Sequence, residues 1–177
     1  MKHAGTKVYR FMIRTWGIHA RELYCAFLSS MIMLMIFFIV HVFSGSPYRV
    51  FFLLRSTREL LPFGVYVMLD LLFTTAIGFA FGLVFAGRGL CGKRYEEKYH
   101  AGMLFVLLAA FWFAVYPLVF RGNMFWMASI CLLMTWLLSL RCIILFYYLQ
   151  PLSGCILLAF LIWISYLLIL LLGCMLI

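Results

Sequence analysis

The chain has 177 residues, of which 68% are hydrophobic and only 11% are charged. A soluble domain is nearer to half apolar and one quarter charged, so this composition excludes an ordinary soluble protein, and its hydrophobicity excludes a disordered chain. It predicts an all-α integral membrane protein, because apolar runs of about 20 residues form spanning helices, whereas barrel strands alternate over about ten.

Five such runs follow one another along the chain. The expected spans are 24–43, 61–86, 101–120, 123–149 and 152–177. They form one transmembrane domain, 24–177, which follows a basic amphipathic segment, 1–23, and contains a long loop, 44–60, after its first span. The very short connections after the third and fourth spans predict that the last three helices are antiparallel neighbours in a five-helix bundle.

Lys and Arg residues are divided unequally between the two sides of this bundle. The side with the amino-terminal segment and the loop after the second span holds ten of them, Arg141 included. The opposite side holds four, which are Arg49, Arg55, Arg58 and Arg121. Because basic residues favour the cytoplasmic side, we expect the amino terminus inside and the carboxyl terminus outside. The net charge of +9 then reflects topology and lipid headgroups, and no nucleic-acid partner is expected.

No familiar catalytic or metal-binding motif occurs in the sequence. The six cysteines include no C-x-x-C pair, and the four histidines lack zinc-site spacing, although one of them could bind a haem iron axially. Glu96, Glu97 and His100 resemble part of an intramembrane protease motif, but they follow or lie in a charged stretch, 93–98, that we expect to be a loop. We therefore expect no catalytic residue, no metal site, no resident cofactor and no enzymatic activity.

Two ionisable residues, Asp70 and Arg141, lie inside the predicted spans. A charge in hydrocarbon is costly, so each is a candidate for function. Their depths differ by roughly 15 Å at about 1.5 Å per residue, so we do not expect them to pair. Arg141 is close enough to the inner face to snorkel toward the headgroups. Asp70 lies in the outer half and is expected to face a protein partner or a water-accessible cavity. Two interpretations stay open: it has a lining role there, or it is a buried, protonated structural residue.

Aromatic residues make up 19% of the chain. Most of them are expected in interfacial belts; one group near the outer interface comprises Tyr116, Phe120, Phe125 and Trp126. Trp112, Trp136 and Trp163 lie deeper, where each indole N–H needs an acceptor. Either the bundle supplies that acceptor, or these rings line a pocket for a flat ligand.

Several motifs resemble those of the TspO (translocator protein, tryptophan-rich sensory protein) family. Residues 159–163, Ala-Phe-Leu-Ile-Trp, resemble its Pro-Tyr-Leu-x-Trp pattern, and residues 77–85 resemble its Met-Gly-Tyr-Gly…Leu-Val-Trp. Pro62 matches the second proline of its Pro-Pro-x-Trp, and Arg121 follows Val119-Phe120 where many members have Phe-Phe-Arg. The likeness covers about residues 48–170. The chain resembles a divergent member, because Asp70 replaces the pocket tryptophan, Ala109 replaces an asparagine, and Leu170-Leu171 replaces a Leu-Asn pair.

The resemblance implies a membrane receptor or carrier for a flat hydrophobic ligand, such as a porphyrin, haem or another tetrapyrrole, bound in the outward half of the bundle. The implied lining residues are Asp70, Thr74, Ala109, Trp112, Phe113, Trp163 and Leu167. The loop 44–60 would act as a lid, with Arg49, Arg55 and Arg58 available to ligand carboxylates. A multi-pass protein of the bilayer is implied, expected in the bacterial cytoplasmic membrane, with a homodimer left open.

Two other classes of function stay open. Asp70 also suits a small secondary transporter, although such proteins more commonly contain discontinuous helices or an internal repeat. A non-catalytic membrane scaffold, in which the polar groups only serve packing, is the other alternative.

Overall fold

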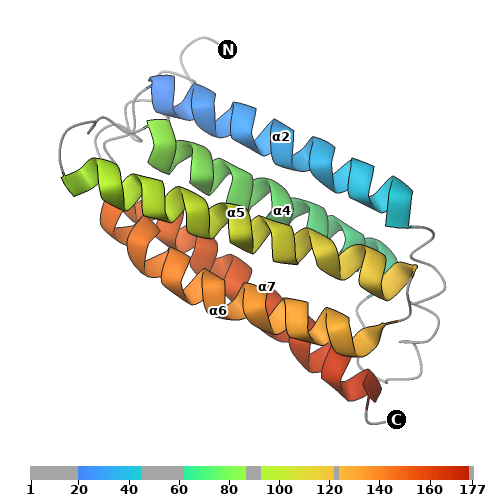
Figure 1. Ribbon diagram of the computed structural model, residues 1–177. Coiled ribbons are helices and arrows are strands. Elements are labelled where there is room, and N and C mark those ends of the chain that lie inside the picture. Colours follow the sequence, from blue (N-terminus) through green and yellow to red (C-terminus); the bar gives the residue numbers. More distant parts are fainter. Residues whose placement is uncertain (1–19, 45–61, 87–92, 122–123, 176–177) are drawn as a thin grey trace.

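The computed structural model describes residues 20–44, 62–86, 93–121 and 124–175, and nearly all of them are helical. The helices are α2 (Ala20–Ser44), α4 (Phe63–Ala86), α5 (Lys93–Phe120), α6 (Phe125–Leu149) and α7 (Pro151–Met175) (Figure 1). All five are long and apolar enough to cross a membrane. The predicted all-helical architecture with five membrane-length helices is therefore confirmed.

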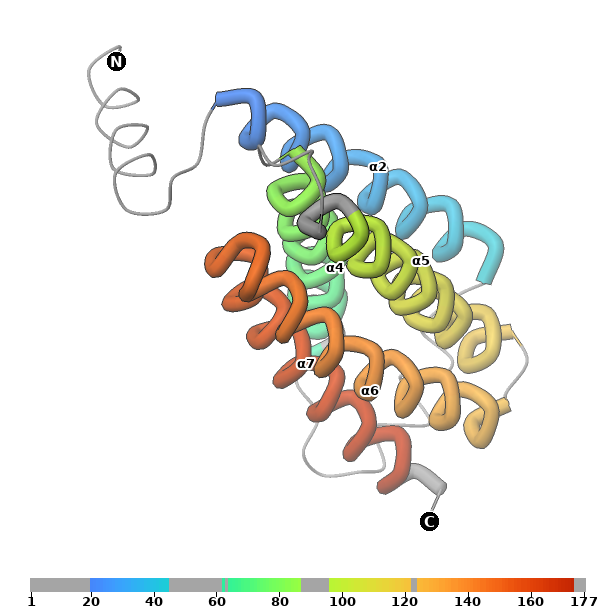
Figure 2. Tube along the Cα trace, turned by 60° about the vertical axis from the view of Figure 1, so that its left-hand side comes forward, coloured from blue at the N-terminus to red at the C-terminus, as the bar shows by residue number. Residues whose placement is uncertain are grey.

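The helices run up and down alternately and close into a ring. Going around it, α2 packs against α4, α4 against α7, α7 against α6, α6 against α5, and α5 against α2 (Figures 1 and 2). The last three helices are neighbours in chain order, as their short connections predict. Since α4 and α5 lie on different sides of the ring, their long side chains meet in its interior.

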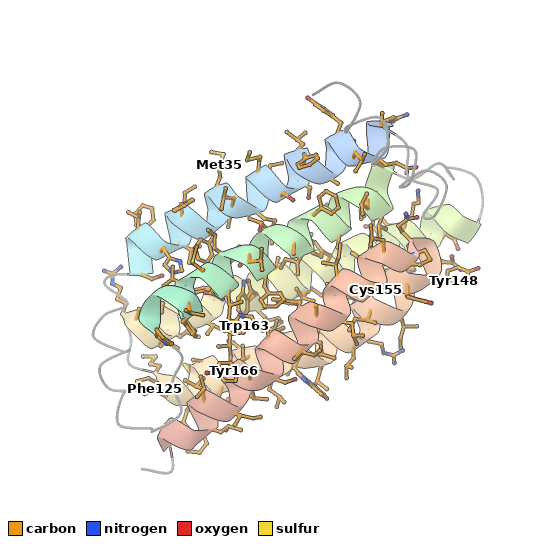
Figure 3. The ribbon with its side chains drawn as sticks, turned by 180° about the vertical axis from the view of Figure 1, so that it is seen from behind. Met35, Phe125, Tyr148, Cys155, Trp163 and Tyr166 are labelled. Carbon is orange, nitrogen blue, oxygen red and sulfur yellow. The ribbon has the colours of Figure 1, made fainter. Side chains whose placement is uncertain are left out.

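Each helix turns one stripe of residues toward this interior. On α5 the buried residues recur every three or four positions, which is the period of one helical face; they are Ala101, Phe105, Leu108, Trp112, Tyr116 and Val119. The outer faces are equally apolar: Met35 on α2, for example, is 65% exposed and points away from the bundle (Figure 3). Because both faces are apolar, the few interior polar groups distinguish the inside of the bundle from its lipid-facing surface.

A close approach of two helices involves two glycines of α4, Gly78 and Gly82. A Cβ atom built on Gly82 would lie 2.5 Å from Ala26 Cα and 2.6 Å from the Cys25 carbonyl oxygen, both in the backbone of α2. Such small-xxx-small spacing lets two membrane helices come into backbone contact. The pair of glycines therefore fixes α2 against α4 at the first half of α2.

The connections differ from the expectations at two points, the start of α5 and the end of α2. The stretch 93–98 is helical, as the first turns of α5, so the expectation that it forms a loop is wrong. An acidic residue in this first turn, Glu96, favours the helix because it complements the positive end of the helix dipole. Ser44 closes α2 and does not begin the loop, while residues 1–19 of the basic segment and 45–60 of the lid lie outside the described residues.

Candidate functional site

Asp70 lies inside the ring, two turns from the start of α4, and only 1% of its surface is exposed. The hydroxyl group of Tyr116 on α5 donates a hydrogen bond to Asp70 Oδ2 at 2.5 Å. The indole Nε1 of Trp163 on α7 donates to Asp70 Oδ1 at 3.3 Å. One carboxyl group on α4 thus joins this helix to both α5 and α7.

Thr74, one turn further along α4, repeats this arrangement. The indole Nε1 of Trp112 on α5 donates to Thr74 Oγ1 at 3.2 Å, and both residues are almost completely buried. Residues four apart share a helix face, so Asp70 and Thr74 together face Tyr116 and Trp112 on the antiparallel α5. The two pairs form a short polar ladder across an otherwise apolar interior.

Trp163 is also the centre of an aromatic cluster. Its ring stacks against Phe73 at a centroid distance of 5.6 Å and an interplanar angle of 18°, and against Tyr166 at 5.5 Å and 27°. Tyr66 contacts the same ring at 5.6 Å with a tilted geometry. Figure 3 shows Trp163 and Tyr166 on successive turns of α7. The buried hydroxyl of Tyr166 has no hydrogen-bond partner among the described residues.

The first spanning helix reaches this cluster through Tyr116. The imidazole ring of His41 lies 4.8 Å from the ring of Tyr116, and Phe37 meets the same ring edge-on at 5.8 Å. Within the part of the chain that the structure describes, the buried Nδ1 of His41 has no hydrogen-bond partner. Tyr116 therefore connects the aromatic rings of α2 with the carboxyl group on α4.

The structure brings together most of the residues that the sequence predicted for the site. Asp70, Thr74, Trp112 and Trp163 are buried and joined by the hydrogen bonds above, and Leu167 is buried in the same apolar core. Ala109 and Phe113 are half-buried and pack at the edge of that core. Arg49, Arg55 and Arg58 lie outside the described residues.

The two remaining residues that the sequence analysis singled out lie elsewhere. Trp136 on α6 donates from Nε1 to Ser165 Oγ at 3.0 Å, so all three deep tryptophans have an acceptor. Arg141 is exposed on α6 while Asp70 is interior, so the two do not pair.

Tyr116 is the main residue that sequence reasoning missed. It was expected in the outer interfacial belt, but only 4% of its surface is exposed and its hydroxyl binds Asp70. The signal was present: Tyr116 follows Trp112 by four residues, the same spacing that separates Asp70 from Thr74. When two antiparallel helices carry residues at this same spacing, the two residues of one helix can each contact one residue of the other. Placing Tyr116 in the interfacial belt leaves this possibility out.

The arrangement offers flat aromatic faces next to a few oriented polar groups. Those groups are one carboxyl, the hydroxyls of Thr74 and Tyr116, and two indole N–H groups, all of them in the ring interior. Such a combination suits recognition of a flat apolar molecule, with stacking for affinity and hydrogen bonds for orientation.

Five membrane-length helices around a small polar and aromatic interior define a multi-pass integral membrane protein. A family model, that of the TspO/MBR family, matches residues 31–176, which include every described residue of the site. The chain belongs to the TspO/MBR family, as its motifs indicated. This membership suggests a membrane receptor or transport role. Comparisons with curated proteins and with solved structures gave no match.

Proposed function

We propose that this protein is a membrane receptor or carrier that binds a flat hydrophobic ligand, of porphyrin or tetrapyrrole type, in the outward half of the bundle. The observation that carries the proposal is the buried set of Asp70, Tyr116 and Trp163, contributed by three helices. Polar groups are costly in a membrane interior and are usually retained for function. Across from Asp70, the wall of the ligand site would be formed by one face of α5, with Ala109, Trp112 and Phe113.

The ligand would reach this set from the outer side. With the amino terminus in the cytoplasm, Asp70 lies about 11 Å from the outer end of α4, at about 1.5 Å per residue. The loop that follows α2 would then cover the entry, and Arg49, Arg55 and Arg58 would meet acidic groups at the ligand's rim. Location in the bacterial cytoplasmic membrane and formation of a homodimer are further predictions that accompany this proposal.

Binding would exchange one set of ring contacts for another. Trp163 stacks on both Phe73 and Tyr166, so a flat ligand would separate one of these pairs and stack on the part of the indole ring that this uncovers. Stacking is retained in such an exchange, whereas the 3.3 Å bond from Trp163 to Asp70 is long enough to be replaced at small cost.

Quenching of tryptophan fluorescence by protoporphyrin and by haem tests the proposal on the purified protein. We expect saturable quenching, and Trp163→Ala or Trp112→Ala should weaken binding by about 1–3 kcal/mol, the size of a well-packed aromatic contact. Trp126→Ala is the matched control, because Trp126 is 73% exposed on α6 and should leave the affinity unchanged. If both Trp163→Ala and Trp112→Ala bind the porphyrins with wild-type affinity, these tryptophans do not contact the ligand and serve only in packing.

Asp70 supports one alternative, a small secondary transporter. Intramembrane carboxylates often belong to ion or proton pathways, and here the carboxyl contacts Tyr116, whose ring in turn contacts the imidazole ring of His41. Uptake into vesicles that depends on a proton or ion gradient, and is lost in Asp70→Asn, would favour this alternative over a receptor.

A further inference from the structure

The partners of Asp70 are all neutral in the described part of the chain. Its two oxygens accept hydrogen bonds from a phenol and an indole, and His41 contacts the ring of Tyr116 rather than the carboxyl group. Among the basic side chains that the structure describes, Arg21, Arg121 and Arg141 are exposed. The other one, Lys98, lies on α5 about 27 Å from Tyr116, at about 1.5 Å per residue.

A carboxylate with only neutral partners is expensive to hold in a membrane. Two neutral donors replace part of its lost hydration, yet its charge stays uncompensated, and a buried charge is normally paired. An incoming cation would therefore gain more at this position than a neutral group of the same shape.

The rings beside Asp70 favour the same kind of ligand. Tyr66 lies one turn before Asp70 on α4 and contacts the ring of Trp163 in a tilted arrangement, and the same ring stacks on Phe73 and Tyr166. Aromatic faces attract cations through their quadrupole, and rings grouped around a positive nitrogen are a common way to bind organic ammonium ions. Charge and ring geometry thus point to one ligand chemistry.

We propose that the site prefers a flat aromatic ligand that carries a positively charged nitrogen, with Asp70 as its counter-ion and the rings of Tyr66 and Trp163 packed against it. This inference rests on the proposed function, since it assumes that a flat ligand enters at Asp70. It assigns the charge of the group that reaches Asp70: a positively charged nitrogen binds there better than a neutral group, and a neutral group better than an anionic one.

Three anthracene derivatives of similar size test this order on the purified full chain. They are 9-aminomethylanthracene, which is cationic at neutral pH, 9-hydroxymethylanthracene, which is neutral, and anthracene-9-carboxylate. We expect the cationic probe to bind about tenfold more tightly than the neutral one, the scale of a cation held by a carboxylate and aromatic faces. In Asp70→Asn, which keeps the shape and removes the charge, the ratio of these two affinities should fall severalfold, because only the aromatic rings then favour the cation.

Glu96→Gln is the matched control, because it removes an exposed carboxylate in the first turn of α5, far from Tyr116 near the end of that helix. This variant should keep the wild-type ratio between the affinities for the cationic and the neutral probe. Equal affinity of the wild type for all three probes would overturn the cation preference and leave the flat-ligand proposal standing. A preference for the carboxylate probe would also overturn it, because the protein would then supply the cation itself. Failure of every probe and of protoporphyrin to bind would overturn both proposals.

Discussion

Tyr116 connects three helices, so its hydroxyl group should matter for stability. Tyr116→Phe removes the donor to Asp70 Oδ2 and keeps the ring that packs against His41 and Phe37. A buried acceptor left without its donor costs about 1–2 kcal/mol, also in membrane proteins. We expect the free energy of unfolding in detergent to fall by that amount, as measured by titration with a denaturing detergent.

Tyr147→Phe supplies the comparison for this experiment. Tyr147 is 58% exposed on α6, so loss of its hydroxyl should change the stability little. If both variants unfold at the same denaturant concentration as the wild type, the bond from Tyr116 contributes nothing measurable and Asp70 is satisfied in another way.

Residue by residue, the sequence predicted which groups need partners but not which partners they find. The three deep tryptophans had to find acceptors, and they find Thr74, Asp70 and Ser165. Their identity depends on how far each helix is shifted and rotated relative to its neighbours. In a bundle with apolar faces all around, no sequence pattern encodes that shift, and so Tyr116 could be taken for an interfacial ring.

At the scale of helices, α4 offers a direct test of the glycine contact with α2. Gly82→Ala places a methyl group 2.5 Å from the backbone of Ala26, where only separation of the two helices can relieve the clash. Forced overpacking of this kind typically costs about 1–3 kcal/mol. We expect a corresponding loss of stability against thermal unfolding in detergent.

Gly64→Ala is the natural control, because it makes the same chemical change in the same helix. A Cβ atom at Gly64 would have nothing within 4 Å, so alanine should be neutral or stabilise the helix by up to about 1 kcal/mol. Equal effects of the two substitutions would mean that helix propensity, and not the contact with α2, decides the outcome at Gly82.

The sequence predicts helix ends where glycine or proline marks them. It does not predict them where a helix continues into a stretch of charged residues. The end of α4 at Ala86 directly precedes Gly87, and α7 starts at Pro151, a residue favoured in the first turn. The start of α5 at Lys93 was missed, because apolar content reports the part of a helix inside the hydrocarbon. A helix can continue into the headgroup region with charged residues, which the criterion of hydrophobicity cannot detect.

For the whole molecule, the distribution of basic residues predicts the orientation in the membrane. A reporter that is active only in the cytoplasm should give a signal when it precedes Met1 and none when it follows Ile177. An odd number of spans is required for this difference. A signal at both ends, or at Ile177 alone, would contradict the predicted topology.

The number of spans was accessible from the sequence, whereas the order of helices around the ring was not. The connections between α5, α6 and α7 are so short that these helices had to lie side by side, and the sequence alone was enough to predict this. Two contacts of the ring, α4 with α7 and α2 with α5, join helices that do not follow each other in the chain. The first of them joins segments separated by two whole helices. It depends on side-chain fit in the interior, where Trp163 meets Asp70 and Phe73.

The position of α7 in the ring has a consequence for biosynthesis. The ribosome delivers α4 early, so Asp70 enters the bilayer before either of its hydrogen-bond donors exists. Tyr116 arrives with α5, but Trp163 arrives only with α7, and until then the wall of the ring beside α4 is open to lipid. We expect a nascent chain that stops after Leu149 to insert four helices and still be recognised as incompletely folded by membrane proteases, and pulse-chase labelling should find a shorter half-life than for the chain that includes α7. Completion of the carboxyl's hydrogen bonds would then coincide with release of the chain from quality control.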